Sequence, residues 1–150
     1  MIRKAKLKDI DNIIKIDKFG KLLNSFSGLD KIEKSSDSKK YYRNAIYSNN
    51  DWVYVAEEDK KVAGFIFFSI QNREEFWKIK KVGYLELIFI DKKHRGKGIA
   101  KELIDKFKKT MKEKKIKYLK LSVQTDNTFA HDFWKKQGFK DYRVDMWSKL

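Results

Sequence analysis

The sequence of 150 residues has no cysteine and no proline. Without cysteine the chain can form no disulfide, no thiolate metal site and no cysteine nucleophile, and it suits a reducing compartment. No apolar stretch approaches the length of a membrane span, and the first residues lack the apolar core of a signal peptide. We therefore expect a cytoplasmic protein with no membrane partner.

Acidic residues are few beside the basic ones. The chain has 36 Lys and Arg against 21 Asp and Glu, a net charge of +15 at pH 7. This balance favours anionic partners such as coenzyme A, nucleic acid or an acidic protein. Only five of the basic residues are arginines, however, and the lysines are scattered along every expected element. Because no nucleic-acid-binding motif accompanies them, we interpret the charge mainly as compositional bias and expect no nucleic-acid partner.

No repeat, low-complexity tract or linker divides residues 1–150, so we expect a single domain. Hydrophobic periodicity and turn residues predict an α/β order of elements. The expected elements are a strand over 2–7, a helix capped by Asp9, a helix over 39–47 capped by Asp37 or Ser38, a hairpin of 52–56 and 62–70, a strand over 84–90, a helix from Ile99, a strand over 117–123, a helix from Asn127 or Thr128 with Gly138 as its C-terminal cap, and a last strand pair over 139–142 and 144–148.

The most informative stretch lies between Gly83 and Thr110. An apolar run from Tyr84 to Ile90 predicts a buried strand, and a turn rich in glycine and basic residues follows it. The next apolar residues have the spacing of an amphipathic helix: Ile99, Leu103, Ile104, Phe107 and Met111. The stretch therefore reads as strand, basic loop and helix.

This loop has the properties of an anion site. A helix start leaves backbone N–H groups without partners, and the helix dipole adds partial positive charge there. Gly96 and Gly98 let a ligand approach the backbone, while Arg95, Lys97 and Lys101 add charge. The glycine spacing matches neither a nucleoside-triphosphate P-loop nor the dinucleotide fingerprint, but a pyrophosphate suits the loop.

Two blocks of sequence match one family. Residues 95–100 read Arg-x-x-Gly-x-Ala, which resembles the coenzyme A loop of the GNAT superfamily of N-acetyltransferases. Residues 127–139, with Asn127, Ala130, Phe133 and Gly138, resemble the family's Asn-x-x-Ala-x-x-Phe-Tyr-x-x-x-Gly-Phe block. The two blocks cover the C-terminal half of the chain, and the N-terminal half agrees in the order of its elements.

The resemblance implies a GNAT-like α/β fold, in which a mixed central sheet with splayed parallel strands is flanked by about four helices. It implies an N-acetyltransferase that moves an acetyl group from acetyl-CoA to a primary amine of a small molecule or a protein. The residues that it implies for the coenzyme are Ile88, Phe89 and Ile90 by their backbone, Arg95, Gly96, Lys97, Gly98, Ile99, Ala100 and Lys101 in the loop, and Asn127, Phe133 and Trp134.

Glu86 is the candidate for proton handling. A carboxylate within an apolar strand is costly to bury without a partner, and its position matches that of the base, or of a residue that holds a relay water, in many members of the family. The alternative is structural: Glu86 points to solvent or pairs with a lysine.

Trp134 departs from the family pattern, because many members have a tyrosine there that serves as general acid. An indole N–H is a hydrogen-bond donor but a poor acid. Either the thiolate leaves without a protein acid, or water or another residue protonates it, or the chain is a non-catalytic module that binds acyl-CoA, nucleic acid or protein.

Several further features carry no readable motif. We expect His94 and His131 to face solvent, and we expect no metal site, because neither histidine has a spaced ligand partner. The segments 20–40 and 71–81, on the acceptor side, do not identify the amine, although the positive chain is a poor match for a polycation. Phe76 and Trp77 either line the acceptor entrance or anchor their loop. The sequence leaves open whether the chain forms a homodimer.

Overall fold

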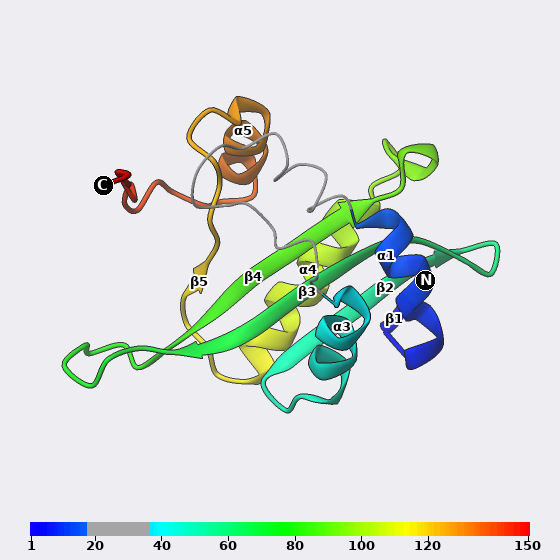
Figure 1. Ribbon diagram of the computed structural model, residues 1–150, viewed down its shortest axis with the longest axis horizontal. Helices are drawn as coiled ribbons and strands as arrows, with labels where there is room; N and C mark the ends of the chain where they lie inside the picture. Colours follow the sequence, from blue (N-terminus) through cyan, green and yellow to red (C-terminus); the bar gives the residue numbers. More distant parts are fainter. Residues whose placement is uncertain (18–36) are drawn as a thin grey trace.

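The computed structural model describes residues 1–17 and 37–150, and Figure 1 shows their arrangement. The strands are β1 (Ile2–Lys4), β2 (Asp51–Glu58), β3 (Lys61–Asn72), β4 (Lys81–Ile90) and β5 (Leu119–Lys120). The helices are α1 (Ile10–Ile16), α3 (Ser38–Tyr47), α4 (Ile99–Glu113) and α5 (Thr128–Lys136), with short 3-10 turns η1 (Leu7–Asp9) and η2 (Lys92–His94).

One mixed sheet with the order β1-β2-β3-β4-β5 organises the chain. The first four strands are antiparallel neighbours, and β5 joins β4 in parallel. A two-residue turn at Asp59 and Lys60, both with positive φ, closes the β2–β3 hairpin. The predicted α/β architecture is therefore confirmed.

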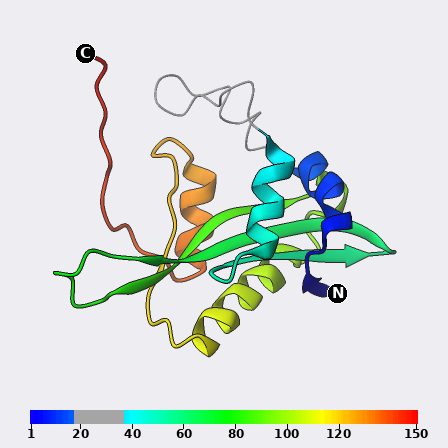
Figure 2. The ribbon, with the colours of Figure 1, turned by 60° about the horizontal axis from the view of Figure 1, so that its bottom comes forward.

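Helices cover both faces of the sheet (Figure 2). The apolar stripe of α4 packs on one face, with Leu103, Ile104 and Phe107 fully buried as the spacing predicted. On the other face α1 and α3 bury Ile13, Tyr42 and Ala45 against β2, β3 and β4. Burial of these two apolar faces, at roughly 25 cal/mol per Å², is the main stabilising contribution to the fold. None of the described helices is long and apolar enough to cross a membrane.

Two predicted helix ends are confirmed by their caps. Asp37 accepts a hydrogen bond from the backbone N–H of Lys40 at 3.0 Å and starts α3. Gly138, with φ of +90°, follows the last turn of α5, where a left-handed residue is needed.

The last two predicted strands, 139–142 and 144–148, are wrong. In the described structure residues 137–150 form no strand, and Tyr142, Val144 and Met146 are exposed. These residues alternate with charged ones, a pattern that fits a strand, but no neighbouring strand lies beside the segment (Figure 2). Local pattern without a pairing partner does not suffice for a strand.

Two other strands are shorter than expected. The first ends at Lys4 rather than Leu7, because the chain turns into η1. The strand predicted over 117–123 pairs only at Leu119 and Lys120. Most of the acceptor-side segment predicted over 20–40 lies outside the described residues, whereas in the other such segment Phe76 and Trp77 are exposed and contact each other.

Asp9 has a different role from the predicted helix cap. Its carboxylate makes no capping bond to α1; instead it pairs with the Arg3 guanidinium at 2.7 Å and accepts the backbone N–H of Lys6 at 2.8 Å. The hydrogen bond from Arg3 is the main cause that holds the pKa of Asp9 below its ordinary value of 3.8. The pair therefore fastens β1 to the turn that precedes α1.

We expect Asp9→Asn to lower the free energy of unfolding at pH 7 by about 2 kcal/mol, because Asp9 is buried and Arg3 keeps only Glu57 as a charged partner. Since the pKa of Asp9 is lower in the folded state, its contribution is present above pH 3.8 and is lost as pH falls further. Urea denaturation of both proteins across this range measures the effect. Equal stability at pH 7 would refute this role.

Candidate active site

The loop between β4 and α4 presents open backbone at the start of a helix. Gly96 and Gly98 have φ of +78° and +81°, a conformation that favours glycine, and no described atom lies within 4 Å of where a Cβ would stand. Gly98 is the N-cap of α4, and Ile99 is buried in the core, so that its side chain anchors the helix start. The loop predicted to bind an anion thus has open backbone at the N-terminus of α4.

The basic side chains of this loop are not all available. Lys101 pairs with Asp105 one turn along α4 at 2.8 Å, and Lys97 pairs with Glu58 of β2 at 3.0 Å. Arg95 forms no ion pair among the described residues, and its Nε donates to the carbonyl of Ile90 at 3.3 Å. Arg95 is therefore the cation of the predicted set that remains open to an anionic ligand.

Glu58 is a site residue that sequence reasoning missed. Its carboxylate also contacts Nδ1 of His94 at 2.8 Å, and this hydrogen bond is the first cause that holds the pKa of Glu58 below its ordinary value. The expectation that His94 faces solvent is wrong, because the side chain is half-buried against Glu58. Glu58 lies 36 residues before His94, and no local pattern reveals such a contact.

The two parallel strands part almost at once. β5 pairs with β4 only at Gly83–Leu119 and Tyr84–Lys120, and beyond them the two chains diverge (Figure 1). The hydroxyls of Tyr84 and Ser122 meet at 2.9 Å where the divergence begins. The predicted splay is confirmed.

The edge of β4 that faces this divergence offers backbone groups. The N–H of Asp91 donates to Ala63 of β3 at 2.9 Å. Because successive residues of a strand direct their backbone groups to alternate sides, the N–H groups of Ile90 and Ile88 point away from β3, towards the side that β5 has left. Phe89, between them, is turned to β3, where it pairs with Phe65.

A β-bulge places Glu86. Phe67 pairs with Leu87 and Phe68 with Leu85, so Glu86 is the extra residue on β4. As a result Leu85 packs in the core beside α4, while Leu87 packs in the core beside α1 and α3. The bulge therefore allows the strand to include Glu86 while Leu85 and Leu87 pack in the two apolar cores.

Polar partners compensate the Glu86 carboxylate. Its Oε1 accepts from the hydroxyl of Ser69 at 2.7 Å and from the amide of Gln71 at 3.3 Å, both on β3. The alternatives weighed for Glu86, a lysine pair or full solvation, do not describe this arrangement. Among the described residues none donates a hydrogen bond to Oε2.

Tyr41 of α3 lies in the same electrostatic environment. Burial of its phenol, and next the charge of Glu86, raise the pKa of Tyr41 to about 12. The ring packs edge-on against Phe67 and keeps 48% of its surface exposed. Tyr41 is therefore a neutral hydrogen-bonding group beside Glu86 at neutral pH.

The second sequence block forms α5. Asn127 caps the helix by accepting the N–H of Ala130 at 3.1 Å. Trp134 is 8% exposed and packs edge-on against Phe133 and Phe139. His131 is half-buried 3.7 Å from Asp141, so the expectation that it faces solvent is wrong. In the parts of the chain described, no three His, Asp or Glu side chains gather to hold a metal.

Comparison with known families decides what this arrangement represents. The model of the acetyltransferase (GNAT) family matches residues 19–139, most of the chain. The chain belongs to the GNAT acetyltransferase family. The resemblance drawn from the loop and α5 is therefore confirmed.

Similar proteins agree with this assignment. An uncharacterised N-acetyltransferase of Archaeoglobus fulgidus is 29% identical, over 93% of this chain and 92% of that protein. An N-alpha-acetyltransferase of Sulfurisphaera tokodaii is 30% identical, over 95% of this chain and 81% of that protein. The fold matches, with a TM-score of 0.76 and 24% identity, a predicted acetyltransferase of Clostridium acetobutylicum solved with acetyl-CoA, over 100% of this chain and 94% of that one.

We expect Glu58→Gln to loosen the loop over residues 92–98, because His94 and Lys97 lose their shared carboxylate. Hydrogen exchange followed by mass spectrometry should show faster exchange there, with little change in the sheet. Glu102→Gln, on the exposed side of α4, is the matched control. Unchanged exchange in the Glu58 variant would contradict the role of this contact.

Proposed function

We propose that this member of the GNAT family transfers an acetyl group from acetyl-CoA to a primary amine of a small molecule or a protein. The observation that carries the proposal is the parting of β4 and β5 directly beside an open, glycine-containing helix start. A long, narrow ligand with a pyrophosphate at one end suits that combination.

The loop residues would hold the pyrophosphate of acetyl-CoA. The backbone at Gly96, Lys97, Gly98, Ile99 and Ala100 supplies N–H groups at the positive end of α4. Arg95 would add a positive charge. Lys97 and Lys101 are paired with Glu58 and Asp105, and they would contribute to the electrostatic potential around the loop.

Other residues would hold the pantetheine arm. Ile88 and Ile90 offer N–H groups on the open edge of β4, and Phe89 fixes the strand by its packing against Phe65. Asn127, Phe133 and Trp134 would act from α5, where Trp134 sets the position of the helix by being buried. When bound, the coenzyme supplies an activated acetyl thioester.

Glu86 would take the proton from the incoming ammonium group, directly or through water. Ser69 and Gln71 hold Oε1, so Oε2 can accept that proton in a fixed position. The free amine then attacks the acetyl carbon, and the N–H of Ile90 or Ile88 stabilises the oxyanion that forms. Nitrogen would gain the acetyl group and release its second proton to water, and sulfur would keep the electrons of the broken C–S bond as thiolate.

The fate of the thiolate separates an enzyme from a binding module. Trp134 is buried and cannot serve as an acid, so the thiolate leaves unprotonated or takes a proton from water or from the Tyr84–Ser122 hydroxyl pair. A non-catalytic acyl-CoA-binding module is the second candidate function, and Trp134 is the observation that favours it.

Coenzyme binding is tested by calorimetric titration of acetyl-CoA. We expect one site in the wild type and loss of binding in the Arg95→Glu/Gly98→Trp variant, because the variant reverses a charge and fills the open backbone. Lys109→Glu, on the exposed surface of α4, controls for net charge. No binding by a folded wild type would overturn the proposal.

Catalysis is tested with a panel of peptides, with free or blocked α-amines, and of small primary amines. We expect Glu86→Gln to lower kcat/KM at pH 7 by roughly 10² or more, the contribution of a general base. The loss should shrink as pH approaches the pKa of the amine, about 8 for a peptide α-amine and about 10 for a lysine-like primary amine, because a free amine needs no base.

Ser69→Ala is a milder test of the same site. We expect it to lower kcat/KM less than Glu86→Gln does, because Gln71 still holds the carboxylate. Ser148→Ala, which changes an exposed hydroxyl near the C-terminus and outside the Glu86 cluster, is a matched control for that cluster. Equal pH profiles for the Glu86→Gln variant and wild type would refute proton transfer by Glu86, and coenzyme binding without transfer to any amine would favour the binding module.

A further inference from the structure

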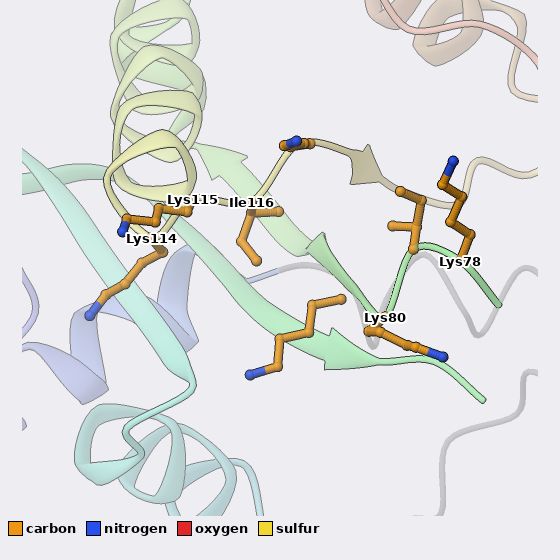
Figure 3. Close-up of a pocket in the computed structure, with 8 residues that line it drawn as sticks. Lys78, Lys80, Lys114, Lys115 and Ile116 are labelled. Carbon is orange, nitrogen blue, oxygen red and sulfur yellow. The ribbon is translucent and has the colours of Figure 1, made fainter. Parts of the chain in front are cut away.

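Two lysine-rich segments meet at the end of the sheet that is remote from the coenzyme loop. Residues 78–81, at the end of the β3–β4 connection and the first position of β4, read Lys-Ile-Lys-Lys, and residues 114–117 after α4 read Lys-Lys-Ile-Lys. Together these eight residues line a hollow of about 350 Å³, which we call the lysine hollow (Figure 3).

Two isoleucines and six lysines line the hollow. Ile79 and Ile116 are half-buried, while all six lysines are exposed. Figure 3 shows labelled lysine side chains from both segments on either side of Ile116, with their ammonium ends directed outwards. Apolar and polar groups occur together in small-ligand sites, whose volumes start near roughly 300 Å³.

The charge of the hollow is not neutralised by the protein. No carboxylate among the described residues forms an ion pair with any of the six lysines. The interactions recorded for them are with a backbone carbonyl, that of Glu75 for Lys80, and with the ring of Trp52 for Lys114. Lysines elsewhere, such as Lys97 and Lys101, do have carboxylate partners. Bringing six like charges together is unfavourable unless an anion offsets the repulsion.

The chain has a lysine at the end of α4 where the backbone conformation favours glycine. Lys115 has φ of +60°, in the left-handed region, and directly follows the C-cap of α4. A residue with a Cβ pays about 1 kcal/mol or more there. The fold thus carries a side chain that lines the hollow at some cost in stability.

We propose that the lysine hollow binds a small ligand of nucleotide size that carries two or more phosphate groups. Lysine ammonium groups act on phosphate as mobile point charges, and the hollow contains no arginine for the bidentate recognition of a carboxylate. The site is distinct from the coenzyme loop, because the 15 residues of α4 separate the two by about 22 Å.

The test uses inorganic triphosphate and ATP as probes, titrated by calorimetry into the full chain. In the Arg95→Glu/Gly98→Trp variant, which disables the coenzyme loop, we expect one site for each probe. This background makes the proposal independent of acetyl-CoA binding.

Two matched double variants locate the site. Lys78→Gln/Lys117→Gln removes one charge from each segment and should weaken binding roughly tenfold, since each exposed charge pair contributes a few-fold. Lys4→Gln/Lys140→Gln removes the same charge from exposed positions elsewhere and should leave the affinity nearly unchanged.

Three results would overturn the proposal. One is that neither probe binds to the wild type. Another is that the two double variants weaken binding equally, which would indicate attraction by net charge alone. The third is that a single-stranded RNA oligonucleotide binds through Lys78 and Lys117 far more tightly than ATP, which would assign the hollow to nucleic acid.

Discussion

The early parting of β4 and β5 is the constraint on which the site depends. Two residue pairs fix the strands at one end, and further along β4 the N–H groups of Ile88 and Ile90 point towards the open side. A strand edge left unpaired next to apolar core is costly unless something replaces its hydrogen bonds. In this family member the proposed replacement is the substrate itself. Binding of the substrate would therefore supply the hydrogen bonds that the open edge of β4 lacks.

Charge pairing distributes the basic residues between structure and ligand. Glu58 holds the loop to the sheet through His94 and Lys97, and Asp9 holds the first strand through Arg3. Few carboxylates take part in these contacts, because the chain has only 21 acidic residues for 36 basic ones. Arg95 and the lysine hollow retain positive charge that no described carboxylate neutralises. Anionic ligands would therefore be attracted most strongly to these two places.

Local patterns in the sequence predicted what depends on local interactions. The stripe from Ile99 to Met111, the caps at Asp37 and Asn127, and the glycines of the loop each follow from residue type and spacing. The contacts of Glu58 with His94 and of Glu86 with Ser69 join residues far apart in sequence, and no spacing rule reveals them. The final strands failed for the same reason, because a strand needs a neighbour that its own residues do not specify.

The short β5 also leaves an outer sheet edge that invites association between chains. β5 itself includes Lys120, and Lys117 lies two residues before it. An identical edge that approached in the antiparallel sense would bring these ammonium groups together, which is how natural proteins discourage edge-to-edge pairing. Repulsion between lysines at this edge thus also opposes aggregation through edge-to-edge pairing.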